Sequence, residues 1–97
     1  MSKESSFQAK LIKRLSKTFP GCIVLKNDSG YIQGIPDLTI LWNNHWAMLE
    51  CKESAEASHR PNQDYYVKMT NDMSFGRFIY PENEEDVLSE LQQAFGV

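Results

Sequence analysis

Residues 34–52 read GIPDLTILWNNHWAMLECK, and this stretch decides the fold. Two apolar runs, 36–42 and 45–52, flank a pair of asparagines at positions 43 and 44. Strand-forming runs separated by a tight two-residue polar turn are typical of a β-hairpin. The sequence therefore predicts two antiparallel strands that are joined at residues 43–44.

The second strand of this hairpin carries charge where an interior strand should be apolar. Side chains alternate faces along a strand, so Glu50 and Lys52 share one side. Pairing position 42 with position 45 sets Asp37 opposite Glu50, and a slip of one residue would separate the two carboxylates. Neighbouring carboxylates repel each other unless a cation lies between them, and a hard divalent cation is the usual solution. The alternative is an exposed Glu50–Lys52 ion pair on an edge strand.

The rest of the chain alternates helix-like and strand-like segments. The pattern predicts, in addition to the hairpin, a helix over 3–18, a strand over 22–26, a loop over 27–35, a helix over 61–73, a strand over 76–80 and a helix over 82–95. Pro61 falls in the first turn of its predicted helix, a position that proline favours. The order α-β-β-β-α-β-α predicts one α/β domain over residues 1–97, with helices against a sheet.

Charge is distributed unevenly along the 97 residues, although the net charge is only −3. Residues 1–26 hold six bases and one acid, a net of +5, whereas residues 81–97 hold five acids and no base, a net of −5. Local charged patches, rather than the net charge of the whole chain, set the electrostatic field around a ligand. The basic segment over residues 1–26 therefore favours nucleic acid as a ligand. The alternative is that its helical stripe of bases is an ordinary solvated face.

Other classes of protein are disfavoured by the composition. No run of about 18 apolar residues is present, so the sequence predicts no membrane span. The opening MSKESSFQAK has no apolar signal core, which predicts a cytoplasmic protein. The two cysteines, Cys22 and Cys51, match no zinc spacing and are expected to be reduced and buried.

The motif GIPD at 34–37, followed by a hairpin and then Glu50-x-Lys52, resembles the PD-(D/E)xK nuclease superfamily. The predicted order α-β-β-β-α-β resembles the restriction-endonuclease-like core of that superfamily, a mixed sheet flanked by helices. Within it, the chain resembles the VRR-NUC family, especially its small stand-alone phage and bacterial members. Those members have a Gln in the next helix, here Gln63, and the resemblance covers roughly residues 4–80.

This resemblance implies hydrolysis of DNA phosphodiesters that depends on Mg²⁺ or Mn²⁺. The implied catalytic residues are Asp37, Glu50, Lys52 and Gln63. Asp37 and Glu50 would bind the metal, with the backbone carbonyl of Cys51 as an extra ligand and Lys52 assisting the water. Family members often carry a Glu in the first helix that supports the metal. This chain offers Glu4 and Gln8 there, so Glu4 is a further candidate ligand.

The implied substrate is branched DNA, such as a four-way junction, cut by a homodimer with two such sites. The expected DNA contacts are Lys10, Lys13, Arg14, Lys17, Lys26, Tyr31 and Arg60. The alternative for the basic helical stripe and for Arg60 is an ordinary surface role, and the alternative for Tyr31 is packing within the chain. Three rival functions remain open at this point: a nicking or flap nuclease, a DNA-binding accessory protein with a weak or dead site, and an acidic protein-interaction domain built on the last helix.

Overall fold

A computed structural model describes residues 2–97 of the chain as an α/β fold with three helices and four strands. The elements in chain order are α1 (Lys3–Thr18), β1 (Ile23–Lys26), β2 (Leu38–Trp42), β3 (His45–Cys51), α2 (Gln63–Met73), β4 (Gly76–Ile79) and α3 (Glu84–Phe95). The predicted element order is confirmed.

The four strands form one open sheet in the order β1-β2-β3-β4. The pairs β1–β2 and β2–β3 are antiparallel, whereas β3 and β4 run parallel and are connected through α2, so the sheet is mixed. The predicted hairpin joins β2 to β3, with Trp42 opposite His45. Asn43 has a φ of 54°, a left-handed conformation that Asn tolerates better than most residues.

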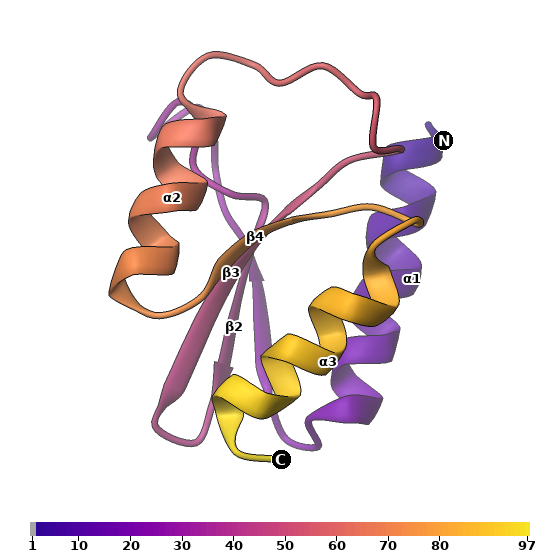
Figure 1. The fold of residues 1–97 in the computed structure, drawn as a ribbon, viewed down its shortest axis with the longest axis vertical. Helices are drawn as coiled ribbons and strands as arrows, with labels where there is room; N and C mark the ends of the chain where they lie inside the picture. Colours follow the sequence, from indigo (N-terminus) through magenta and orange to yellow (C-terminus); the bar gives the residue numbers. More distant parts are fainter. Residues whose placement is uncertain (1) are drawn as a thin grey trace.

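The helices cover the two faces of the sheet unequally: α1 and α3 lie on one face and α2 on the other (Figure 1). The main core lies on the α1/α3 side, and its fully buried side chains include Leu11, Leu15, Phe19, Leu38, Ile40, Leu49 and Leu91. Cys51 is buried in this core, and both cysteines are free. No helix within residues 2–97 is both long and apolar enough to cross a membrane.

The first helix has the bounds that its sequence predicts. Ser2 caps it by accepting a hydrogen bond at Oγ from the backbone N–H of Ser5, 3.0 Å away. Leu11 and Leu15 lie one turn apart on its inner face, where both are buried. Gly21 follows the helix with a φ of +86°, which turns the chain toward β1.

The later boundaries differ from the prediction by one or two residues. The second helix begins at Gln63, not at 61, because Asn62 takes a left-handed φ of 69° and leaves Pro61 outside the helix. The last helix begins at Glu84, not at 82, because the Asn83 side chain closes a turn on the preceding strand. Each strand is also shorter than predicted: the observed ranges are 23–26 for the predicted 22–26, 38–42 for 36–42, 45–51 for 45–52 and 76–79 for 76–80.

Candidate active site

The hairpin register brings two carboxylates together at one end of the sheet. Leu38 pairs with Leu49, so Asp37 and Glu50 are the next residues across the two strands. Asp37 is held there because its Oδ2 accepts a 3.0 Å hydrogen bond from the backbone N–H of Cys51. The predicted pairing of position 42 with 45 is therefore confirmed, and with it the placing of Asp37 opposite Glu50.

Burial sets the ionisation of these two groups. Glu50 is only 2% exposed, and burial together with the charge of Asp37 raises its pKa to about 8. Burial also raises the pKa of Asp37, although its hydrogen bond from the Cys51 N–H opposes that rise. Glu50 Oε1 is buried without a hydrogen-bond partner among the described residues. An ionised carboxylate oxygen in that condition is costly unless a cation or a water pairs with it, whereas a protonated Glu50 can share a hydrogen bond with Asp37.

A buried chain of hydrogen bonds connects Glu50 to Lys52 through the side chain of Gln63. Gln63 Nε2 donates to Glu50 Oε2 at 2.9 Å, and Gln63 Oε1 accepts from Lys52 Nζ at 2.7 Å. The Arg60 backbone N–H also donates to Gln63 Oε1, at 2.8 Å, and Lys52 Nζ also donates to the Ser58 carbonyl, at 3.0 Å. The amide of Gln63 thus has a fixed orientation, and it sets the positions of both charged groups.

The position of Gln63 depends on a close contact between two loops. Gly34 has a φ of +92°, and a Cβ added to it would lie 2.6 Å from Asn62 Cβ and 2.7 Å from the Asn62 backbone carbon. Asn62 is the cap residue directly before Gln63. The glycine of the GIPD motif therefore has a physical reason: only a residue without a side chain lets this loop seat the start of α2 beside the carboxylates.

These residues line a polar cavity of about 320 Å³. Its lining residues are Glu4, Ser29, Gln33, Gly34, Asp37, Glu50, Lys52, Arg60, Pro61 and Gln63. Of the two candidates in the first helix, Glu4 lines this cavity, and its pKa is raised by burial and by the charge of Asp37. Gln8 is not among the lining residues. Ser29 and Gln33 were not predicted, since the loop sequence gives no periodic signal for the direction of a side chain.

The donor set suits a small, hard, largely hydrated cation. Within residues 2–97, no three His, Cys, Asp or Glu side chains gather closely enough to form a protein cage for a metal. Mg²⁺ does not require such a cage, because it commonly binds one or two carboxylates and keeps several waters. The unpaired Glu50 Oε1 and the neighbouring Asp37 carboxylate fit that mode. The Cys51 side chain points into the core, so only its backbone lies at the site.

Of the predicted DNA contacts, one lines the cavity and the others lie elsewhere on the surface. Arg60 lines it, whereas Lys10, Lys13 and Lys17 are exposed along α1 and Lys26 is exposed at the end of β1. Arg14 forms ion pairs with Glu84 and Glu85 of α3, each at 2.8 Å, so its charge is already neutralised.

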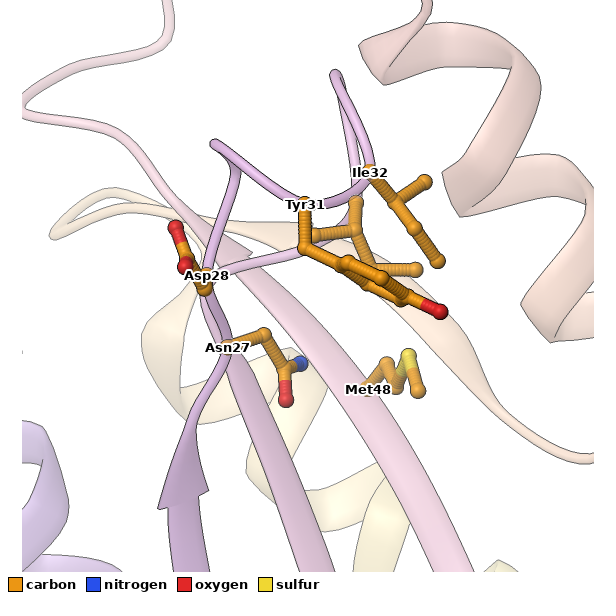
Figure 2. A pocket seen from close by; sticks show the side chains of 6 residues that line it. Asn27, Asp28, Tyr31, Ile32 and Met48 are labelled. Atoms are coloured by element: carbon orange, nitrogen blue, oxygen red, sulfur yellow. The ribbon is translucent and has the colours of Figure 1, made fainter.

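Tyr31 is 86% exposed and lies on the rim of a second hollow, next to the cavity (Figure 2). This position leaves both faces of the ring largely uncovered. His45, for which no catalytic role was expected, lies at the hairpin turn and packs against Phe95.

Comparisons with protein-family models, with curated proteins and with solved structures gave no match for this chain. The functional argument therefore rests on the geometry of the cavity and on the residues that form it.

Proposed function

We propose that this chain is a metal-dependent DNA endonuclease with a restriction-endonuclease-like core of the PD-(D/E)xK type. The observation that carries the proposal is the pairing of half-buried Asp37 with fully buried Glu50, which is connected through Gln63 to the ammonium group of Lys52. Two neighbouring acidic side chains alone are weak evidence for a catalytic metal site. Here Glu50 is buried, its Oε1 has no hydrogen-bond partner among the described residues, and it is linked to a buried lysine, an arrangement that is costly to keep and therefore favours a functional role.

The residues of the chain have separate tasks in this proposal. Asp37 and Glu50 hold Mg²⁺ or Mn²⁺, with the Cys51 carbonyl and Glu4 as further oxygen donors. The chemistry that this ion supplies when bound is Lewis-acid polarisation of the phosphate and activation of water. Lys52 orients the attacking water and stabilises negative charge on the phosphate, while Gln63 holds Lys52 and Glu50 in register. Hydrolysis then adds water across one P–O bond of the DNA backbone.

The substrate class is supported by charge rather than by a shaped groove. Three free lysines, Lys10, Lys13 and Lys17, form an exposed stripe along α1, and Arg60 lies in the cavity itself. Such a stripe supplies the contacts to phosphates that position DNA. The preference for branched DNA rests on the resemblance to the VRR-NUC family alone.

The test is cleavage of a labelled four-way junction, a linear duplex and a single strand, each with Mg²⁺ or Mn²⁺ and with EDTA. Asp37→Asn and Glu50→Gln are the informative variants, because each keeps an oxygen to accept its present hydrogen bond while it loses the charge. Lys68→Ala is the matched control, since within residues 2–97 Lys68 forms one ion pair, with the exposed Asp72 on α2.

Metal-dependent cutting of the junction, lost in both variants and kept in the control, is the expected result. Cutting of all three substrates would keep the nuclease and remove the preference for junctions. Cutting of nicked or flapped duplex alone would assign the nicking or flap activity. Binding of DNA with no cleavage under any metal would favour the accessory DNA-binding protein, a function compatible with the lack of a three-ligand metal cluster within residues 2–97.

A further inference from the structure

One face of the sheet has apolar side chains exposed over β1 and β2, although Thr39 of β2 is buried there. On this face α2 packs against β3 and β4, but Ile23, Leu25 and Leu41 stay 56%, 46% and 38% exposed. The register pairs Ile23 with Leu41 and Leu41 with Trp46, so these side chains point to the same side. We call the surface formed by Ile23, Leu25, Leu41, Trp46 and Met48 the open sheet face.

The loop over residues 27–35 closes one end of the open sheet face. Between this loop and Met48 lies a mainly apolar hollow of about 480 Å³, which is lined by Tyr31 and Ile32 (Figure 2) and also by Ile35, Asn27 and Asp28. The same loop lines the catalytic cavity through Ser29, Gln33 and Gly34. A molecule that covers the open sheet face would therefore also hold one wall of the catalytic cavity.

The chemistry of this surface decides what covers it. The positions that form this part of the sheet surface are uncharged: Ile23, Leu25, Asn27, Thr39, Leu41, Trp46 and Met48. The charged positions on the same side of the sheet, Asp37 and Glu50, lie beyond them at the end that forms the cavity. The neighbouring Lys26 pairs with Leu38, whose side chain is buried in the core on the other face. DNA phosphates would find no cation on the open sheet face, and an acidic or basic partner would find no opposite charge.

A second copy of the chain needs neither a cation nor an opposite charge on this surface. In a two-fold contact the same apolar surface meets itself, so complementarity follows without opposite charges. Tyr31, Ile23, Leu25 and Leu41 together expose roughly 500 Å², and a standard interface buries about 800 Å² per partner. The half-buried Trp46, Met48, Ile32 and Ile35 adjoin this area, so that the size approaches what a stable dimer needs.

We propose that the open sheet face is the contact surface between two copies of this chain. In that dimer the loop over residues 27–35 is held by the partner, so that assembly fixes a wall of each catalytic cavity. The effect of assembly on the catalytic cavity rests on the proposed function, whereas the contact between the two copies does not.

Sedimentation velocity from about 1 to 200 µM, without metal or DNA, tests the contact. The wild-type chain is expected to sediment as a species of twice 11.2 kDa at the upper concentrations. Leu25→Glu buries a charge in the contact and is expected to raise the dissociation constant at least about 100-fold. Val97→Glu is the matched control, because Val97 is 60% exposed and lies at the end of α3, away from the open sheet face. Circular dichroism checks that the variants fold, and Leu41→Glu is a second, independent probe.

A wild-type chain that stays monomeric at every concentration would overturn the proposal. So would a dimer that survives both Leu25→Glu and Leu41→Glu in folded protein. Quenching of 2-aminopurine in a junction by a monomeric wild-type chain, lost in Tyr31→Ala, would assign the hollow to an unpaired base instead. The sedimentation test does not depend on cleavage. A chain that forms the dimer but fails the cleavage assay would therefore count against the proposed function and not against the contact surface.

Discussion

The contact between Gly34 and Asn62 makes a sharp prediction, because the chain contains a matched glycine for comparison. Gly34 and Gly21 have nearly the same φ, +92° and +86°, so an alanine meets a similar backbone strain at either position. That strain is roughly 1–2 kcal/mol for an L-residue, offset in part by about 0.4–1 kcal/mol from the less flexible unfolded chain. Gly21→Ala should therefore cost about 1 kcal/mol of stability.

The two positions differ in what the new Cβ meets. At Gly21 the added Cβ would meet no described atom within 4 Å apart from its chain neighbours. At Gly34 it would lie 2.6–2.9 Å from three atoms of Asn62, two of them in the backbone. Relieving such an overlap requires the loop and the start of α2 to move apart, at a further cost of roughly 1–3 kcal/mol. Gly34→Ala should therefore cost about 2–4 kcal/mol in total.

Urea denaturation followed by circular dichroism measures both free energies of unfolding, and the difference between the two variants isolates the overlap. In the folded fraction, Gly34→Ala should also lose metal-dependent cleavage, since Gln63 moves with Asn62, while Gly21→Ala keeps it. Equal destabilisation by the two alanines would refute the idea that the GIPD glycine exists to seat α2. Full activity in Gly34→Ala would refute the positioning of Gln63 by this contact.

Three further predictions concern the buried network and the basic helix. Glu50 has a pKa of about 8 in the folded protein against an ordinary value of 4.5, so Glu50 ionises at a lower pH in the unfolded chain than in the folded one. The free energy of unfolding should therefore fall as the pH rises from about 4.5 to about 8. Urea titrations at several pH values measure this fall, and Glu50→Gln should flatten it. Gln63→Leu should cost about 2–3 kcal/mol by urea denaturation, because it leaves both Lys52 and Glu50 without their shared partner; an unchanged stability would contradict the network. Lys13→Ala should reduce the slope of log binding constant against log salt by about 0.9 in DNA titrations, whereas the neighbouring Arg14→Ala should leave it nearly unchanged, since Arg14 is paired with Glu84.

Side-chain periodicity and turn chemistry were enough to predict the order of the elements. The alternation in 45–52 and the asparagine turn at 43–44 fixed the hairpin register, because a two-residue turn leaves only one pairing that keeps Leu49 and Ala47 in the core. That register is the reason why Asp37 and Glu50 were placed together from the sequence. Local signals also located both ends of the first helix.

Tertiary contacts decided the rest. The start of α2 depends on Asn62 meeting Gly34, two residues that are far apart in sequence and carry no mutual signal. The loss of Arg14 as a free cation depends on α3 packing beside α1, which a charge count within one helix does not reveal. The open face over β1 and β2 exists because α2 packs mainly against β3 and β4. The sequence alone thus determined which residues alternate and where chains turn, since these are short-range properties of the backbone. Which loops meet, which charges pair and which apolar face stays uncovered were decided by long-range packing, because those contacts join residues that no local pattern connects.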